Sequence, residues 1–378
     1  MSMSKSSEGE GRGTLRGARP GVVALVRAAS WLAVLPYVLV VLLVGTGSPT
    51  WSAVAYLAGA GVLLWGLTTL PGRAEVPARS GRLRPRGLAR GGAAALVAVA
   101  AIRGCTARAG ETMSFAPGPR IVARLFDEQD IAVAGTRVLV GGGLLRDDAD
   151  ELPAAMRAAY ARMRAEEGDA PSPVLATYLG MQSPSEFDLV VVEPGSEARP
   201  GDAVVFLHGY AGNFALPCWQ MARAVAPLGV LTACPSTRWI GDWWSPDGEA
   251  TVRRTVEALR ARGVTRIVLA GLSNGGYGAS RLAPRLRSSL AGLVLISGAA
   301  PDAPPSGLPT LVVHGRRDSM ASFSSATAYA ARSGARVVAL DAGHFSMLVR
   351  ADANDAAVRA FVASVLGRRV ARADGAAR

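Results

Sequence analysis

The chain has 378 residues, of which half are hydrophobic and 19% are charged. Its net charge is +12, but residues 1–110 hold 13 of the basic groups and only three acidic ones, so the remaining 268 residues carry just +2. This nearly neutral body has no basic stripe with interleaved aromatic residues, which removes the support for a nucleic-acid-binding protein. The apolar composition points instead to membrane segments.

Two apolar segments follow a basic N-terminal stretch. Residues 28–72 contain no charged side chain, and the turn-forming residues 45–49 divide them into two halves near the ~20 residues needed to cross a bilayer. We expect membrane spans at about residues 28–46 and 51–70, preceded by a disordered, cytoplasmic basic tail at residues 1–27. A buried helical hairpin in a soluble core is the alternative. A cleaved signal peptide fits worse, because the apolar stretch continues into a second segment.

A third apolar run, at residues 91–102, determines the topology. Its 12 residues are short for a span, but snorkelling arginines extend it to residues 87–106. The positive-inside rule places the basic flanks of the first two spans in the cytoplasm. If the third run crosses, everything after Cys105 is extracytoplasmic, and if it does not, the body is cytoplasmic. We favour crossing, and therefore expect a multi-pass membrane region at residues 28–106 with an extracytoplasmic body.

The cysteines do not describe a disulfide framework. There are three of them, Cys105, Cys218 and Cys234, and no C-x-x-C spacing for a metal or redox site. A Cys218–Cys234 bridge is one option if the body is exported, and buried free thiols are the other.

Residues 107–172 are expected to form a connecting helical and irregular segment. Between residues 150 and 167, Met156, Tyr160 and Met163 recur at helical spacing, which predicts a helix. A stretch rich in glycine and proline ends this helix.

Residues 173–369 alternate short apolar runs with helical stretches, and residues 370–378 are expected to be a disordered tail. The expected strands are residues 189–192, 203–207, 230–233, 266–270, 292–296, 310–313 and 336–339. The expected helices are residues 214–226, 248–262, 277–290, 321–333 and 354–366. This alternation indicates a mostly parallel sheet covered by helices on both faces. In such sheets the chemistry lies at the carboxyl ends of the strands.

The stretch Gly271-Leu-Ser-Asn-Gly275 lies at a predicted strand-to-helix turn. Alone, a G-x-S-x-G pentapeptide decides little in a chain with 44 glycines. Between a strand and a helix, however, the glycines let the backbone pass through a sharp turn that presents the serine. Ser273 is therefore the candidate nucleophile.

A serine nucleophile needs a base and an acid to orient that base. His344 follows the last predicted strand, at the same sheet edge as Ser273, and Asp318 lies in the loop after the preceding strand. The order Ser273, Asp318, His344 matches the order that this architecture uses. Asp341 and Asp242 compete for the role of the acid, although Asp341 is too close to His344 along the chain to reach the far nitrogen of its ring.

The two other histidines also follow predicted strands. His314 is expected to be structural, bonding the loop that holds Asp318. His208 lies in Leu207-His-Gly-Tyr-Ala-Gly-Asn213, where a His-Gly loop is expected to complete the oxyanion hole. Its backbone N–H and that of Asn274 would meet the developing negative charge.

From Pro173 to Leu366 the sequence resembles the α/β-hydrolase superfamily. The resemblance rests on LHGYAGN, GLSNGG, HGRRD and AGH, in this order. It implies the α/β-hydrolase fold, with Ser273 as nucleophile, His344 as base, Asp318 as acid, and Tyr210 with Asn274 as oxyanion donors. GLSNGG and the short length look most like small carboxylesterases, polyester depolymerases and feruloyl-esterase-like enzymes. The short connection before the strand at residues 310–313 implies a core without the lid that many lipases carry.

A tryptophan-rich loop follows another strand end. It contains Trp239, Trp243 and Trp244, which are predicted to wall an acyl or aromatic pocket because loops at this edge surround the nucleophile. The alternative is that they pack beneath the loop as part of the core.

Together these patterns predict a membrane-anchored serine hydrolase that cleaves a carboxylic ester, thioester or amide through an acyl-enzyme. The expected substrate is a small-molecule, lipid or polymer ester, and no metal or organic cofactor, nucleic acid or specific protein partner is inferred. Two alternatives stay open: acyl transfer by the same triad beside the membrane, and a non-catalytic binding module on a hydrolase scaffold. The identity of the substrate and the oligomeric state also stay open.

Overall fold

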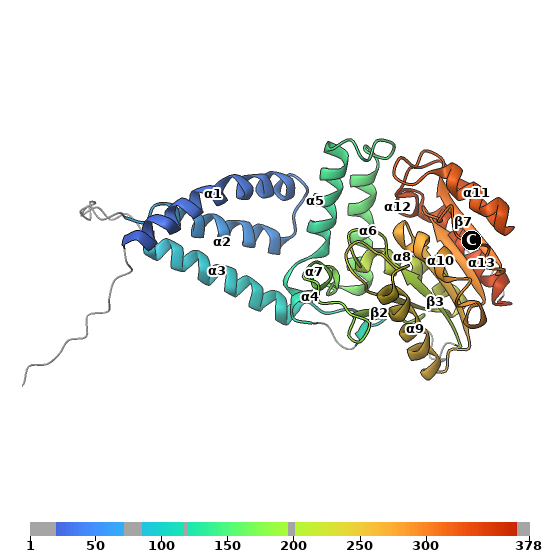
Figure 1. Ribbon diagram of the computed structural model, residues 1–378. Helices are drawn as coiled ribbons and strands as arrows, with labels where there is room; N and C mark the ends of the chain where they lie inside the picture. The colour runs from blue at the N-terminus through green and yellow to red at the C-terminus, as the bar shows by residue number, and fades with distance from the viewer. Residues whose placement is uncertain (1–19, 72–84, 117–119, 196–200, 369–378) are drawn as a thin grey trace, which may run out of the picture. The chain divides into compact units, whose positions relative to one another are not determined.

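The computed structural model describes residues 20–71, 85–116, 120–195 and 201–368 (Figure 1). Its contacts divide the chain into two compact units, one made of Met1–Leu42 and Ala55–Val97 and the other of Leu43–Val54 and Ala98–Arg378. The first unit holds most of the N-terminal helices, and the second holds an α/β body.

Three long apolar helices make up the N-terminal region: α1 (Pro20–Gly45), α2 (Trp51–Thr68) and α3 (Pro85–Thr106). Among the described residues, these three are long and apolar enough to cross a membrane. The expected span at residues 87–106 lies within α3. Helix α1 begins eight residues before the expected start of the first span. The rest of the expected tail, residues 1–19, lies outside the described residues.

Helices α2 and α3 approach closely at two glycines. A Cβ on Gly66 would lie 2.3 Å from the backbone nitrogen of Ala89, and one on Gly92 would lie 2.4 Å from that of Leu63. Both contacts are with backbone, so no larger residue fits at either position. Small residues at such contacts are typical of helices that associate within a membrane.

The body of the second unit is built on one sheet, which has eight strands within the described residues. The strands are β1 (Met113–Ala116), β2 (Leu189–Val192), β3 (Asp202–Leu207), β4 (Leu231–Pro235), β5 (Arg266–Leu272), β6 (Gly292–Ile296), β7 (Thr310–Gly315) and β8 (Arg336–Leu340). Their spatial order is β1-β2-β4-β3-β5-β6-β7-β8. Strand β2 pairs antiparallel with both β1 and β4, and every other pair is parallel. The predicted mostly parallel sheet is therefore confirmed.

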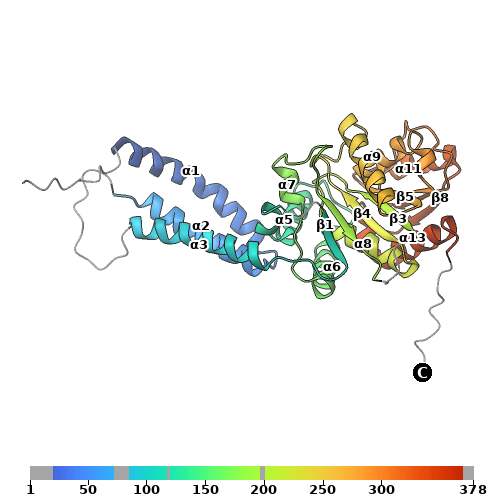
Figure 2. The ribbon, with the colours of Figure 1, turned by 90° about the horizontal axis from the view of Figure 1, so that it is seen from below.

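Helices cover both faces of this sheet. The helices of this body are α4 (Val122–Leu125), α5 (Glu128–Gly141), α6 (Leu152–Glu167), α7 (Val174–Tyr178), α8 (Ala215–Val225), α9 (Pro246–Ala261), α10 (Asn274–Leu282), α11 (Phe323–Ser333), α12 (Ser346–Val349) and α13 (Ala351–Val365). Helices α8 and α13 pack on one face, and α9 and α11 pack on the other (Figure 2). Along β3, Val204 and Phe206 join the first cluster and Val205 and Leu207 the second, because successive strand residues point to opposite faces.

The segment expected only to connect, residues 107–172, is part of the body. Its strand β1 extends the sheet by pairing with β2, and the predicted helix at residues 150–167 is observed as α6. Met156, Tyr160 and Met163 of α6 are buried in the same core cluster as α8 and α13. The boundary expected at residue 173 therefore cuts through one hydrophobic core.

Helix α10 differs from the expected helix at residues 277–290. It begins at Asn274, directly after the predicted nucleophile, and ends at Leu282. The end is explained by Pro284, which has no backbone N–H to donate to a carbonyl oxygen of the preceding turn and so cannot continue the helical hydrogen bonds.

The sheet register brings the predicted site residues to one edge. Leu207 at the end of β3 pairs with Gly271 of β5, and Gly315 at the end of β7 pairs with Leu340 of β8. The loops after β3, β5, β7 and β8 therefore leave the sheet at the same edge.

Candidate active site

Ser273 occupies a sharp turn between a buried strand and a helix. Strand β5 ends at Leu272 and α10 begins at Asn274, and Ser273 between them has φ 54° and ψ −118°. Residues other than glycine rarely adopt a positive φ, and strain of this kind concentrates at functional sites. The turn is held in place by the Ser273 N–H, which donates to the carbonyl oxygen of Ile296 at 2.9 Å.

Two glycines make this turn sterically possible. A Cβ on Gly271 would lie 2.2 Å from the carbonyl oxygen of Gly275, and one on Gly275 would lie 2.0 Å from that of Leu207. Backbone atoms cannot yield here without displacing β3 or the first turn of α10. The glycines around Ser273 are therefore a packing requirement of the strand-to-helix turn.

The side chains of Ser273, His344 and Asp318 form a continuous hydrogen-bonded chain. His344 Nε2 lies 3.0 Å from Ser273 Oγ, and His344 Nδ1 lies 3.0 and 2.8 Å from Oδ1 and Oδ2 of Asp318. A carboxylate only accepts hydrogen bonds, so Nδ1 carries the proton. The unprotonated Nε2 can then accept the proton of the serine hydroxyl.

Asp318 accepts hydrogen bonds from four donors. Its Oδ1 accepts the N–H groups of Met320 and Ala321 at 2.9 and 2.8 Å, and its Oδ2 lies 3.1 Å from His314 Nε2. His344 is the fourth donor. Burial alone would raise the pKa of the Asp318 carboxyl, but the hydrogen bonds from His314 and His344 outweigh it and hold the pKa well below its usual value. The carboxylate is therefore ionised at neutral pH.

His314 binds the side chain of Asp318 and the loop that follows it from the interior of the protein. Its buried ring places Nε2 between two acceptors, the carbonyl oxygen of Ala321 at 3.0 Å and Asp318 Oδ2. Nε2 therefore carries the proton and donates to the Asp318 loop. This placement agrees with the structural role expected for His314.

The loop after β3 approaches the nucleophile at Gly209. A Cβ on Gly209 would lie 3.1 Å from Ser273 Cβ and 3.7 Å from Ser273 Oγ. The predicted oxyanion donors Tyr210 and Asn274 directly follow Gly209 and Ser273, so their backbone N–H groups belong to the two segments that flank the hydroxyl. The side chain of Asn274 donates to the carbonyl oxygen of Ile240 at 2.7 Å and ties the tryptophan-rich loop to the same place.

His208 anchors this loop from the interior. Its Nδ1 bonds to the carbonyl oxygen of Gly209 at 2.8 Å, and its Nε2 accepts the Thr237 N–H at 3.2 Å. Trp243 Nε1 donates to the carbonyl oxygen of His208 at 2.9 Å. Burial lowers the pKa of His208 to about 4, so the ring is neutral at pH 7 with its proton on Nδ1. His208 therefore shapes the loop through its ring.

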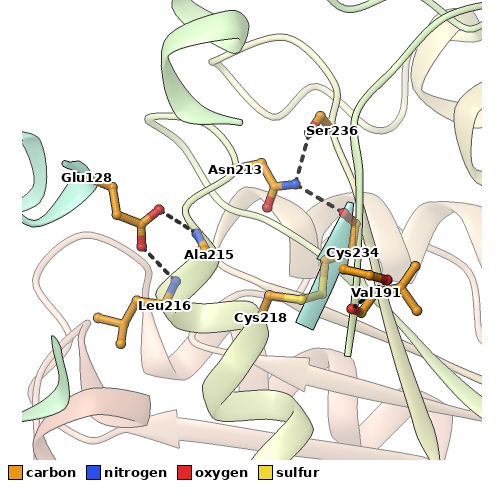
Figure 3. Close-up of a disulfide and its surroundings, with 9 residues drawn as sticks. Glu128, Val191, Asn213, Ala215, Leu216, Cys218, Cys234 and Ser236 are labelled. Carbon is orange, nitrogen blue, oxygen red and sulfur yellow. Dashed lines mark hydrogen bonds between the residues drawn. A yellow bond between two sulfur atoms is a disulfide. The ribbon is translucent and has the colours of Figure 1, made fainter. Parts of the chain in front are cut away.

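Two links to β4 fix the beginning of α8 behind the loop (Figure 3). Asn213 Nδ2 donates to the carbonyl oxygen of Cys234 at 3.1 Å and to Ser236 Oγ at 2.9 Å. A disulfide joins Cys218 in α8 to Cys234 in β4. Of the two options that the sequence left open, the structure has the bridge, and Cys105 is free and exposed.

The side chain of Glu128, which is distant from α8 in the sequence, caps the N-terminus of this helix. Its carboxylate oxygens accept the N–H groups of Ala215 and Leu216 at 2.7 and 2.9 Å (Figure 3), which satisfies two donors that a helix N-terminus leaves open. Burial raises the pKa of Glu128 to about 7, although the hydrogen bonds to it act in the opposite direction. This contact could not be predicted from the sequence, because no local pattern connects residues 87 positions apart.

The three tryptophans of the predicted pocket wall do not share one environment. Trp243 is fully buried, and a Cβ on Gly278 would lie 2.2 Å from Trp243 Cβ. Its prediction as a pocket wall is therefore wrong: the glycine leaves room for it in the core. Trp239 and Trp244 are 42% and 39% exposed. Trp239 packs edge to face against Tyr210, with 5.0 Å between the ring centroids.

The two other candidates for the acid that orients His344 have different partners. Asp242 pairs with Arg238, and Asp341 is exposed and pairs with Arg317. Within the described part of the chain, Asp318 is the acid whose hydrogen bonds reach His344. The geometry therefore favours Asp318 over both alternatives.

The strand order, the strained turn at Ser273 and the order of the loops that follow β5, β7 and β8 define an α/β-hydrolase fold. No protein-family model matches the chain, and no curated protein matches it by sequence.

Similar solved structures include Est1E from Butyrivibrio proteoclasticus with ferulic acid bound, at 15% identity and a TM-score of 0.42, covering 48% of this chain and 96% of that one. The Pyrococcus furiosus esterase Pf2001 has 14% identity and a TM-score of 0.40, covering 48% and 90%. The enol-lactonase from Burkholderia xenovorans LB400 has 17% identity and a TM-score of 0.39, covering 47% and 96%. Likeness at this level carries no functional argument, because one fold hosts many activities.

Proposed function

We propose that the chain is a membrane-anchored serine hydrolase that cleaves a carboxylic ester through an acyl-enzyme on Ser273. The observation that carries the proposal is the hydrogen-bonded chain from Ser273 through His344 to Asp318, with the serine in a strained turn. Thioesters and amides are open to the same chemistry.

The proposed reaction has two halves. His344 Nε2 takes the proton of Ser273 Oγ as the oxygen attacks the carbonyl carbon, and the resulting oxyanion is met by the N–H groups of Tyr210 and Asn274. The alcohol leaves with the proton from His344, and the acyl group stays on Ser273. Water then attacks the acyl-enzyme, again losing its proton to His344, and the acid is released as Ser273 regains a proton.

A fluorophosphonate probe tests this proposal, because it reacts covalently with an activated serine. The full-length protein in membranes is expected to be labelled, with the modification on Ser273. Ser273→Ala is expected to abolish the labelling. Ser185→Ala, a change of an exposed serine, is the matched control and should be labelled like the wild type. An unlabelled wild type, or equal labelling of Ser273→Ala, contradicts the proposal.

Acyl transfer is the alternative that the same residues support. It is distinguished by the products from a labelled ester with and without added alcohol. Free acid in both reactions supports hydrolysis, whereas a new ester that displaces the free acid supports transfer.

The proposal places the α/β body outside the cytoplasm. Basic residues cluster before residue 28 and between residues 73 and 90, which favours the cytoplasm for both of these flanks. Three crossings then leave the chain after Thr106 on the opposite side. The Cys218–Cys234 disulfide supports this assignment, because disulfides persist in oxidising compartments.

The turn between α1 and α2 supports the same side. It belongs to the compact unit of the body, where the N–H and Oγ1 of Thr50 bond to the Asp130 carboxylate of α5 at 3.0 and 2.6 Å. Arg137 of α5 donates to the carbonyl oxygen of Leu43 at 2.9 Å. When both basic ends of this hairpin lie in the cytoplasm, the turn lies on the opposite side of the membrane. The residues of α5 that contact the turn then lie on that side too.

A reporter fused after residue 115 tests the topology. A reporter that is active only outside the cytoplasm is expected to be active, because the fusion point follows the third span. A cytoplasmic reporter at the same position should be inactive. The opposite pattern would defeat the three-span topology.

A further inference from the structure

The loop between α5 and α6 carries a buried carboxylate outside the proposed triad. Asp148 is 1% exposed, and both of its oxygens accept the backbone N–H of Gly343, at 2.8 and 2.9 Å, across 195 residues of sequence. A buried carboxylate is costly unless it is hydrogen-bonded, and bonds to a charged acceptor are among the stronger ones. This contact therefore fixes Gly343 firmly.

Gly343 is held from two sides, directly before His344. A Cβ on Gly343 would lie 2.8 Å from Asp148 Oδ2, so only glycine lets the carboxylate approach. On the other side, a Cβ on Gly315 at the end of β7 would lie 2.2 Å from the carbonyl oxygen of Gly343. The backbone that precedes His344 is thus enclosed between Asp148 and the end of β7.

The same loop also contacts the residue after the acid. Ser319 Oγ donates to the carbonyl oxygen of Leu144 at 3.3 Å. At the start of α6, Glu151 pairs with Arg350, which lies between α12 and α13. The α5–α6 hairpin therefore bonds to the loops of both members of the His344–Asp318 pair and to the segment that follows them.

We propose that Asp148 is a positioning residue for the base: through the Gly343 N–H it fixes the backbone of His344, so that the imidazole stays within reach of Ser273 Oγ. The inference rests on the proposed hydrolase function and gives the α5–α6 hairpin a part in it. Catalytic groups must be held to within about 0.5 Å, and a misplacement of about 1 Å can lower the rate by about 10²-fold.

Kinetics of Asp148→Asn and Asp148→Ala test the proposal. Asparagine keeps one acceptor for the Gly343 N–H but loses the charge, and alanine leaves the N–H without a partner. We expect kcat to fall about tenfold in Asp148→Asn and about 10²-fold in Asp148→Ala, with KM changed by less than about threefold. Each kcat is divided by the number of active sites titrated with the fluorophosphonate, so that unfolded protein does not contribute.

Asp150→Asn is the matched control, because it removes an exposed carboxylate from the same loop and should keep the wild-type kcat. A merely structural role for Asp148 would lower the melting temperature while leaving kcat per titrated site within about twofold of wild type in both variants, and that result overturns the proposal. A raised KM with unchanged kcat overturns it too. If Asp148→Ala does not fold, Asp148→Asn decides by the same criterion. The failure of the hydrolase function itself is recognised separately, because the wild type would then not be labelled.

Discussion

Replacing Asp318 by asparagine is expected to lower kcat for ester hydrolysis by about 10⁴-fold, with KM nearly unchanged. The hydrogen-bonding partners of this carboxylate are donors: the N–H groups of Met320 and Ala321 on Oδ1, His314 on Oδ2, and His344 on both. An amide has one oxygen for these donors, and its NH₂ group must face at least one of them.

The lower kcat is expected because the substitution changes which ring nitrogen of His344 carries the proton. If the asparagine oxygen stays with the Met320 and Ala321 N–H groups, the NH₂ group faces His344 Nδ1, which can bond to it only without its own proton. The proton then sits on Nε2, where it blocks acceptance of the Ser273 proton. The variant is expected to fold, because the side chain keeps its shape.

The measurement is kcat and KM on a soluble p-nitrophenyl ester, with active sites titrated by a fluorophosphonate. Asp341→Asn is the control, because Asp341 is exposed and lies three residues from the base. Its kcat should stay within about twofold of wild type. A loss below tenfold in Asp318→Asn would remove Asp318 from the role of the acid.

The sequence was sufficient to predict the central sheet. Buried parallel strands read as uninterrupted apolar runs, and the six parallel strands from β3 to β8 appear at the expected places. Ser273, Asp318 and His344 lie together because parallel strands end at one edge of a sheet. Their proximity therefore follows from topology, without any knowledge of side-chain contacts.

The contacts that fix the loops of the candidate site could not be predicted in this way. Asp148 and Glu128 accept hydrogen bonds from residues 195 and 87 positions away in the sequence. The local sequence around each of them predicts a helix at most, and gives no sign of these distant partners. Strand β1 has only four residues at the edge of the sheet, too few for a recognisable alternation. These features exist only once the chain has folded.

The burial of Trp243 could not be predicted from the sequence for a different reason. Its neighbours Trp239 and Trp244 are partly exposed, whereas Trp243 is buried because Gly278 leaves room for its side chain and the carbonyl oxygen of His208 accepts its N–H. A tryptophan in a loop has no period that assigns it to the core or to the surface. Only the positions of its distant partners decide between the two.

Replacing both Cys218 and Cys234 by alanine is expected to lower the free energy of unfolding by about 3 kcal/mol, the value for a closed loop of about 15 residues. The two cysteines are 16 positions apart and fully buried, so alanine avoids the buried hydroxyl that serine would introduce. In a domain of this size, the loss corresponds to a fall in Tm of about 6–12 °C.

Thermal unfolding in detergent, followed by circular dichroism, measures this shift. Wild type treated with dithiothreitol should melt near the double variant, and Cys105→Ala should melt within about 1 °C of untreated wild type, because Cys105 takes no part in the bridge. Alkylation in denaturant before reduction should modify Cys105 and spare Cys218 and Cys234, because unfolding exposes all three sulfur atoms but leaves the bridge intact. Modification of all three without reduction would contradict the bridge. It would also remove one of the three arguments for an extracytoplasmic body, and leave the topology to the positive-inside rule and the contacts of the α1–α2 turn.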